Sequence, residues 1–408
     1  MGHLPTREAA LDILFQVIAF DASVEDVPLD MALGRVVAAD VHARLDIPNA
    51  TVSQHDGIAI RRTLAECVRQ GRGFLRQQEY GVVGMGDVIR EGFDTIVPDE
   101  LCRFFSDGNV ELSMLPEYGS GVVAKGSSIR KGERMLAPGH RLTPANLSIL
   151  RLSGVEQVMV YRKPLVSILP IGTDCRMPGT ELQPGEMIES NSILISSMVQ
   201  ECGGTAKVLP PVADDADLIR DTVLSNIAHC NLLITIGGIG IRGKRYGDMV
   251  PSALETIGRI ILQGVQIAPG GKNLLFAKVQ GKCVFGIPGA PHGALMVTEQ
   301  FLPAIMEQFL HYPCWERPEI EVVLGADFPA HSATPYLARS ALHWNGADYI
   351  MTPLRPGDTA DCFINSCAVA TLSSGNEHCH KGDRMRVSLI YGERAIRAET
   401  KSNQGTEP

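Results

Sequence analysis

The sequence predicts a multidomain protein of the α/β plus β class, because three regions of the chain are patterned differently. Between residues 164 and 313, buried strand-like runs alternate with helical segments, which is typical of a three-layer domain with a mostly parallel sheet. Residues 51–139 contain short strand-like pieces separated by glycines, and they predict a small β-rich domain. After Pro313 short alternating segments return, which predicts a C-terminal β-barrel-like domain.

Length and composition limit the number of domains, the kinds of partner and the location that we expect for this protein. A chain of 408 residues is long enough for roughly two to four domains. A net charge of −9 argues against general nucleic-acid binding. The ten cysteines include no CxxC pair, which indicates reduced thiols rather than a disulfide framework. The N-terminal stretch is a poor signal peptide, and no apolar run approaches the ~18 residues of a membrane span. We therefore expect a cytoplasmic protein that binds neither nucleic acid nor membranes.

The chain begins with a predicted helix, capped by Thr6 and continuing to about Ala19, because its apolar residues recur at helical spacing. We group residues 1–50 with residues 140–163 as an N-terminal helical and linker domain that encloses the inserted domain of residues 51–139. The other elements expected in this N-terminal domain are helices over residues 29–39 and 144–152 and extended segments over residues 41–47 and 157–161.

Residues 164–313 carry the pattern of the central α/β domain. Gly203 and Gly204 can end one helix, and Asp214 or Asp215 can cap another. Its expected strands cover residues 165–169, a segment near 208, 232–236, 274–279 and 284–287, and its expected helices cover 191–202, 216–228, 251–257 and 293–310. In the domain of residues 314–394, strands are expected over 320–324, 348–351, 368–372 and 384–390, and the polar tail of residues 395–408 is expected to be disordered.

Glycine-rich loops follow several strands of the α/β region. In open α/β sheets, ligands bind just beyond the carboxyl ends of the strands, and free backbone N–H groups there suit phosphates or oxyanions. The longest loop runs from Gly237 to Asp248 and contains three cations. It predicts a pocket for an anionic ligand, and the alternative is a tight turn with a solvated basic tip. The cations are Arg242, Lys244 and Arg245, and the other loops span residues 171–174, 268–273 and 288–293.

Two acids in these loops are candidate metal ligands. Asp174 and Asp248 can hold a divalent cation, because magnesium prefers one or two carboxylates together with phosphate oxygens. The alternative is that each aspartate caps a helix or closes a turn. Two further clusters, over residues 53–56 and 378–380, are interpreted as ordinary loops. A catalytic triad is assembled from separate elements, and adjacent side chains need not converge on one metal.

Taken together, the order of these pieces resembles the MoeA family, the molybdopterin molybdenumtransferases, and also the E domain of gephyrin. The resemblance covers the chain to about residue 392, and it is the combination of motifs that is specific. The segments that carry it are Pro28–Asp40, Ser53–Gly57 with its Ser-x-x-Asp-Gly pattern, Arg141–Leu147, Arg162–Pro164, Pro184–Asn191, Thr235–Gly238 and Phe285–Pro291.

The resemblance implies a four-part, dimeric protein whose α/β domain binds molybdopterin. It implies that the Ser-x-x-Asp-Gly loop completes the site of the partner subunit. The implied reaction takes adenylylated molybdopterin and molybdate (or tungstate), uses Mg²⁺, and releases AMP while the metal stays on the pterin. A molybdopterin adenylyltransferase is an implied protein partner.

Residues of this chain that match the family's motifs become its expected site residues. Catalytic roles fall to Asp56, Asp174, Asp214 and Asp248, with Asp174 and Asp248 as metal ligands. The expected cofactor-binding residues, which include those of the glycine-rich loops, are Gly172, Thr173, Gly237, Gly238, Arg242, Lys244, Arg245, Lys272, Pro288, Gly289 and Pro291.

Several motif positions depart from the family's pattern. Asp174 replaces a glutamate, and Ile236, Ala268 and Ala290 replace a serine, a lysine and an asparagine. Losing a charge-assisted hydrogen bond costs about 1.5–3 kcal/mol, so several losses together can remove ligand affinity. The basic segment of residues 242–245 is a hypothetical substitute for the lost lysine. Two functions therefore stay open: a divergent insertase, or a non-catalytic paralogue that carries the cofactor or serves as an assembly scaffold.

Overall fold

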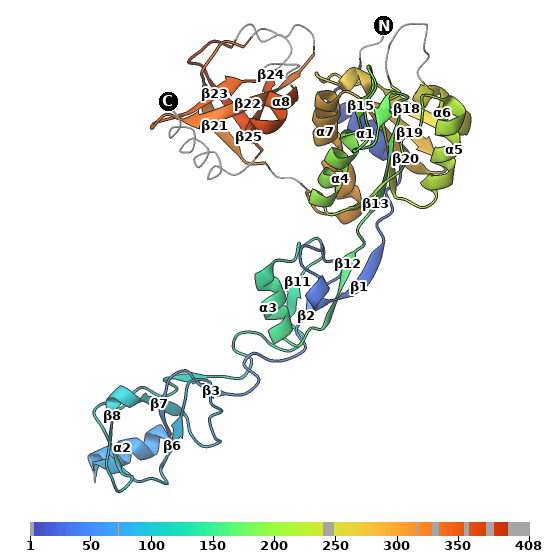
Figure 1. Cartoon of the computed structure of the whole chain (residues 1–408). Coiled ribbons are helices and arrows are strands. Elements are labelled where there is room, and N and C mark those ends of the chain that lie inside the picture. The colour runs from blue at the N-terminus through green and yellow to red at the C-terminus, as the bar shows by residue number, and fades with distance from the viewer. Residues whose placement is uncertain are drawn as a thin grey trace. The chain divides into compact units, whose positions relative to one another are not determined.

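The computed structural model describes residues 4–71, 73–239, 249–314, 317–328, 334–354, 359–372 and 379–390. The chain divides into two compact units (Figure 1), of which unit 1 contains Met1–Ser23 and Arg162–Pro408 and unit 2 contains Val24–Tyr161. The domain boundaries that we expect from the sequence, including the grouping of residues 1–50 with residues 140–163, stay predictions. No described helix is long and apolar enough to span a membrane.

A six-stranded mixed sheet forms the centre of unit 1, with the order β16-β13-β17-β20-β19-β18. The first four strands run parallel, and the last two are antiparallel to their neighbours. The expected strands are confirmed, but β18 was not predicted. The bounds are β13 Leu165–Pro170, β16 Thr205–Val208, β17 Leu232–Ile236, β18 Gly258–Gln263, β19 Leu275–Val279 and β20 Lys282–Ile287.

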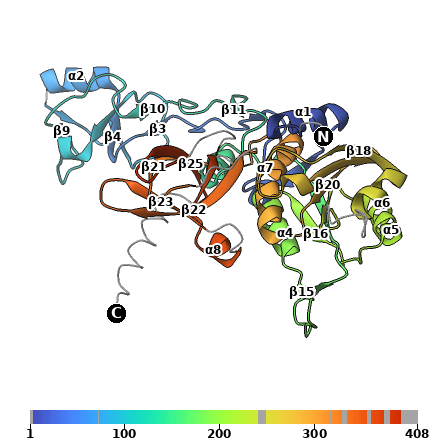
Figure 2. The same cartoon turned by 90° about the horizontal axis from the view of Figure 1, so that it is seen from above.

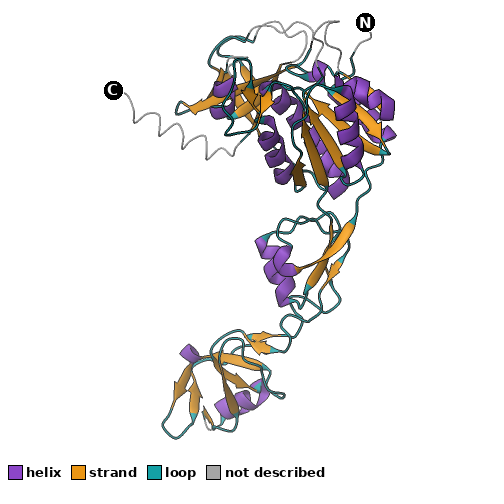
Figure 3. Ribbon diagram, turned by 45° about the vertical axis from the view of Figure 1, so that its right-hand side comes forward, coloured by secondary structure: helices purple, strands orange, loops and turns teal. Residues whose placement is uncertain are grey.

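Helices cover both faces of this sheet (Figures 2 and 3), which confirms the three-layer α/β architecture. On one face, helices α5 and α6 contribute to a core cluster that includes Val223, Leu254 and Leu275. On the other face lie α4 and α7, and the aromatic rings of Phe276, Phe285 and Phe301 pack together there. The bounds are α1 Arg7–Val17, α4 Asn191–Glu201, α5 Ala216–Ile227, α6 Met249–Ile257 and α7 Pro291–Leu310, with a one-turn η3 Gly271–Asn273.

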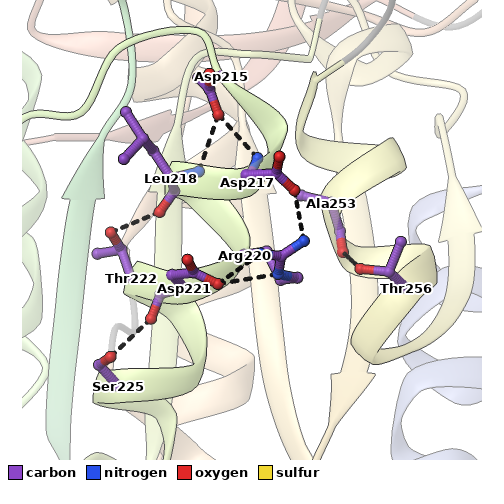
Figure 4. A network of polar contacts seen from close by, with 9 residues as sticks. All are labelled: Asp215, Asp217, Leu218, Arg220, Asp221, Thr222, Ser225, Ala253 and Thr256. Atoms are coloured by element: carbon purple, nitrogen blue, oxygen red, sulfur yellow. Dashed lines mark hydrogen bonds and ion pairs between the residues drawn. The ribbon is translucent and has the colours of Figure 1, made fainter.

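Capping residues fix two of these helices where the sequence predicts. Thr6 caps α1 by accepting a hydrogen bond from the backbone N–H of Ala9 at 3.3 Å. Asp215 caps α5 by accepting from the N–H groups of Asp217 and Leu218 at 2.9 and 3.0 Å (Figure 4). Each cap satisfies backbone donors that have no partner within the helix.

The C-terminal part of unit 1 is a closed five-stranded barrel with the order β21-β23-β22-β24-β25, which confirms the expected β-barrel. Strand β22 and the short helix α8 were not predicted. A buried cluster that includes Val322, Met351 and Val387 fills the barrel. The bounds are β21 Glu319–Leu324, β22 Tyr336–Trp344, β23 Tyr349–Pro353, α8 Thr359–Ile364, β24 Ala368–Leu372 and β25 Arg384–Leu389.

The described residues of unit 2 form short strands and two α-helices. The expected helix over residues 29–39 is wrong. Only Leu29–Met31 forms a 3₁₀ turn (η1), Gly34 has a φ of +71°, and Val36 and Val37 pair with extended backbone at Arg141 and Val160. Helix α3, Pro144–Leu152, is confirmed, and Thr143 and Asn146 form a capping box at its start. The ribbon and linker strands are β1 Val24–Pro28, β12 Gln157–Tyr161, β2 Val41–His42 and β11 Arg134–Leu136.

The inserted region of unit 2 is β-rich, as predicted. Two three-stranded sheets enclose buried residues that include Ile58, Ile60 and Val97. The helix α2, Arg62–Gln70, was not predicted. The strands are β3 Val52–Ser53, β4 Gly57–Ile60, β5 Phe74–Leu75, β6 Tyr80–Val83, β7 Thr95–Pro98, β8 Cys102–Phe104, β9 Val110–Leu112 and β10 Val122–Val123, with a one-turn η2 Asp99–Leu101.

Candidate functional site

Three parallel strands of unit 1 end side by side, and their loops form the candidate site. The register pairs Pro170 with Ile236, and Ile236 with Ile287. The N–H of Ile171 donates to the carbonyl of Ile236 at 2.8 Å, and the N–H of Gly237 donates to that of Ile287 at 3.0 Å. The structure therefore brings together most of the predicted loop residues that it describes: Gly172, Thr173, Gly237, Gly238, Pro288, Gly289 and Pro291.

Glycines let these loops approach each other more closely than side chains would allow. At Gly237, where φ is +87°, a Cβ atom would lie 2.5 Å from the carbonyl oxygen of Ile171. A Cβ at Gly289 would lie 3.3 Å from the Cα of Gly237. Real Cβ atoms do not occupy the first position, so Gly237 is required by backbone packing as well as by its conformation.

Asn191, which was not among the predicted site residues, secures the third loop. Its side chain is buried at the start of α4, and its Nδ2 donates to the carbonyl of Gly289 at 2.8 Å. Helix α4 is thereby joined to the loop between β20 and α7, and truncation of Asn191 would leave a carbonyl without its partner.

Asp214 supports the first loop. Its Oδ2 accepts hydrogen bonds from the N–H of Thr173 at 2.9 Å and from its Oγ1 at 3.2 Å. The N–H of Gly172 donates to the carbonyl of Val212 at 3.0 Å. One carboxylate oxygen of Asp214 is thus engaged with Thr173, and the other makes no hydrogen bond or ion pair with a described residue.

Asp174 lies in the same loop, but its side chain makes no hydrogen bond or ion pair with any described residue. The next residue, Cys175, is half-buried. Burial raises the pKa of its thiol, and so do the negative charges of Asp174, Glu189 and Asp214. The loop therefore offers a free carboxylate next to a neutral thiol.

Helix α7 begins at this edge of the sheet. Pro291 stands at its first position, and its N-cap residue, Ala290, provides no side-chain cap. Uncapped N–H groups at a helix start favour an anion, aided by the helix dipole. His292 follows, with a buried Nε2 that has no partner among described residues. Burial, together with the positive charge of Arg339, lowers the pKa of His292.

Lys272 is exposed in η3, on a loop that packs against the first turn of α7. A Cβ at Gly270, where φ is +92°, would lie 2.8 Å from the carbonyl oxygen of Gly293. The loop also pairs with the barrel, because the N–H of Leu337 donates to the carbonyl of Ala268 at 2.8 Å. The structure thus places Lys272 on a backbone fixed against α7 and the barrel.

The remaining predicted site residues do not lie among the described loops at this edge of the sheet. Arg242, Lys244, Arg245 and Asp248 lie outside the described residues. Asp56 belongs to unit 2, where its Oδ1 accepts from the N–H of Met85 at 2.7 Å. The described part of the chain contains no cluster of three or more His, Cys, Asp or Glu side chains that could hold a metal. Residue 378, which belongs to the sequence cluster of residues 378–380, also lies outside the described residues.

Sequence reasoning missed a buried polar network that joins α7 to the barrel. Glu299 forms ion pairs with Arg339 of β22 and with Arg317, the latter at 2.9 Å. Nη1 of Arg339 also donates to the hydroxyl of Ser366 at 2.7 Å. The one available signal was an acid, Glu299, within the apolar run of α7, but its arginine partners could not be read from spacing.

Comparisons with known proteins agree with this geometry. The profile of the MoeA N-terminal region (domain I and II) matches residues 5–154, and that of a probable molybdopterin binding domain matches residues 177–307. A molybdopterin molybdenumtransferase of Bacillus subtilis is 26% identical over 90% of both chains. That of Haemophilus influenzae is 25% identical over 77% of this chain and 80% of its own.

Solved structures extend the likeness to the fold. A molybdopterin biosynthesis MoeA protein from Pyrococcus horikosii covers 96% of this chain and 100% of its own, with a TM-score of 0.82 and 22% identity. The two family profiles match separate parts of the chain, and the structural likeness extends over nearly all of it. The chain therefore contains a MoeA N-terminal region and a probable molybdopterin binding domain, and it is similar to molybdopterin molybdenumtransferases.

Proposed function

We propose that this protein inserts molybdate, or tungstate, into adenylylated molybdopterin and releases AMP in a magnesium-dependent reaction. The coarser part follows from the family: it is a molybdenum cofactor biosynthesis protein, similar to enzymes named molybdopterin molybdenumtransferases. The finer part is supported by one observation. Three strand ends, the uncapped start of α7 and the unpartnered carboxylate of Asp174 lie at one edge of the sheet.

The chain's own groups suit a phosphorylated ligand. We assign the phosphates of the substrate to the loop beyond Gly237 and to the first turn of α7. Negative charge at a helix start is stabilised by about 0.3–1 kcal/mol, and by up to ~2 kcal/mol when partly buried. Lys272 adds a positive charge on the neighbouring loop. Such fixed donors stabilise the negative charge that develops when a phosphoanhydride is cleaved.

The acids present fit magnesium, which prefers one or two carboxylates together with phosphate oxygens. Asp174 has no competing partner among the described residues, and Asp214 keeps one carboxylate oxygen that Thr173 does not use. Asp248 is the further expected ligand and lies outside the described residues. When bound, magnesium neutralises charge on the phosphates.

Replaced residues favour a second function, a carrier or scaffold without turnover. Ala290 offers no side-chain acceptor to the start of α7. Ile236, where the family has a serine, is 3% exposed and serves packing. If the remaining contacts bind the pterin but do not stabilise bond cleavage, the protein would hold the cofactor and release no AMP.

We also propose a homodimer in which the loop carrying Asp56 completes the site of the partner copy. The resemblance to the family supports this arrangement. Asp56 lies on an exposed loop of unit 2, where its Oδ1 accepts a hydrogen bond from the N–H of Met85. Its Oδ2 does not take part in that hydrogen bond. We further propose that a molybdopterin adenylyltransferase supplies the substrate.

One assay separates these functions. Purified protein is given adenylylated molybdopterin, molybdate and magnesium, and AMP release is followed together with metal bound to the pterin. An insertase releases AMP in a magnesium-dependent reaction that Asp174→Ala slows by at least tenfold, which is the effect of losing about 1.4 kcal/mol. Tight pterin binding without AMP release would identify the carrier instead. If the protein neither binds the pterin nor releases AMP, both proposals are contradicted.

A further inference from the structure

Arg176, which the sequence did not single out, fixes the backbone on both sides of Asp174. Its Nη1 donates to the carbonyl of Thr173 at 2.9 Å and to the carbonyl of Cys175 at 2.9 Å. The carbonyl of Asp174 itself accepts from the N–H of Met187 at 3.0 Å. All three consecutive carbonyl groups therefore have a donor, and the peptide planes that orient Asp174 are held in place.

The other end of the Arg176 guanidinium is held as well. Its Nη2 forms an ion pair with Glu186. Glu186 also accepts from the N–H of Gln183 at 2.9 Å. That backbone hydrogen bond and the positive charge of Arg176 lower the pKa of Glu186, so this partner stays ionised at neutral pH. The two short strands β14 Cys175–Arg176 and β15 Met187–Ile188 pair in parallel around it.

The fixed backbone around Asp174 contrasts with its side chain, which has no such partners in the described part of the chain. The carbonyl of Asp174 and the carbonyls on either side of it each accept a hydrogen bond, yet the Asp174 carboxylate has no partner among the described residues. Fixing a backbone costs conformational entropy, about 1–2 kcal/mol per residue, and the Asp174 carboxylate makes no hydrogen bond or ion pair with a described residue that would offset this cost. Preorganised ligand-binding groups show this combination, because their contacts form only when the ligand arrives.

We propose that Arg176, held by Glu186, is a positioning residue that fixes the Asp174 carboxylate for the divalent cation accompanying the phosphorylated substrate. This inference rests on the proposed function. An arginine suits the task because its planar fork donates to two carbonyls and a carboxylate at once. A lysine, with a single compact ammonium group, cannot span the same partners. Lysine should therefore restore the charge but only part of the positioning.

Two readouts test the assignment in the full-length protein. The first is hydrogen exchange at the amides of Thr173, Cys175, Met187 and Glu189, each of which donates a hydrogen bond in or beside this loop. The second is the magnesium concentration that gives half-maximal AMP release. The variants are Arg176→Gln, Arg176→Lys and Glu186→Gln.

Arg220→Gln is the matched control. The Arg220 side chain is 33% exposed, against 37% for Arg176. Its guanidinium also pairs with carboxylates, those of Asp217 and Asp221 on its own helix α5 (Figure 4). A general effect of losing a surface arginine would appear in both variants, whereas loss of positioning appears only at Arg176.

We expect Arg176→Gln to speed exchange at these amides and to raise the required magnesium concentration about tenfold or more, since a misplaced catalytic group can cost up to 10²-fold. Arg176→Lys should fall between wild type and Arg176→Gln. Unchanged exchange would overturn the inference, as would faster exchange with an unchanged magnesium requirement. If the wild-type protein releases no AMP, the proposed function fails. Mn²⁺ binding with the pterin nucleotide, followed by EPR, then replaces turnover as the second readout, and absence of Mn²⁺ binding overturns the inference.

Discussion

Replacing Asn191 with alanine tests how the fold supports the site. The Asn191 side chain is buried and donates to the carbonyl of Gly289 at 2.8 Å. Alanine removes the donor and leaves this carbonyl unsatisfied, which costs about 1–3 kcal/mol. For a folded unit of this size, each kcal/mol lowers the melting temperature by about 2–4 °C. We therefore expect a decrease of roughly 2–12 °C for the transition of unit 1.

The matched control is Asn226→Ala. Asn226 donates to the carbonyl of Thr222 at 2.9 Å within helix α5 and is only partly buried. Surface substitutions of this kind stay within about ±0.5 kcal/mol. Thermal unfolding followed by tryptophan fluorescence, to which Trp344 in β22 of unit 1 contributes, measures both variants. Equal melting temperatures for Asn191→Ala and wild type would refute the role given to this hydrogen bond. The same variant should weaken pterin binding, because the Gly289 loop would be free to shift.

Two further predictions concern titration and assembly. The pKa of His292 is lowered in the folded protein by burial and by Arg339, so the unfolded chain binds more protons below its ordinary pKa of about 6.5. The free energy of unfolding should then fall as pH decreases below about 6.5. Denaturant titrations at several pH values should show a shallower fall for His292→Phe than for wild type, and an equal pH dependence in the two proteins would contradict this. If Asp56 serves the partner copy, Asp56→Ala and Asp174→Ala proteins should each be inactive. After unfolding and refolding together they should recover part of the AMP release, and no recovery would argue against a shared site.

Much of the central domain could be predicted from the sequence because its strands are buried on both faces. Leu232–Ile236 is a continuous apolar run in a strand whose residues are all buried, and such runs mark central parallel strands. Strand β18 was missed because Gly258–Gln263 lies at the sheet edge and has no buried residue, so burial imposes little pattern on it. Helix α2 was missed for a related reason, since most of its residues are polar or charged.

The wrong helix over residues 29–39 shows how tertiary pairing overrides local spacing. Leu29, Ala32 and Val36 are buried as a helical pattern would require. However, Val36 and Val37 pair with extended segments more than a hundred residues away, at Arg141 and Val160. Spacing along the chain reports which residues are buried, but several backbone conformations can bury the same residues.

The candidate site was predictable in its loops but not in its supports. Glycines after buried strands indicated where the loops would meet, because the carboxyl ends of parallel strands share one edge. Arg176 with Glu186, and Glu299 with Arg339, form pairs that depend on the folded geometry. Nothing in the spacing of these charges along the chain identified their partners.

The most direct test of the central claim is a single-turnover measurement on wild-type protein loaded with adenylylated molybdopterin and magnesium. Addition of molybdate should release one AMP for each molybdenum that becomes bound to the pterin, with the two signals rising together. AMP release without metal transfer, or a stable complex that neither molybdate nor tungstate alters, would contradict the assignment of this protein as a working insertase.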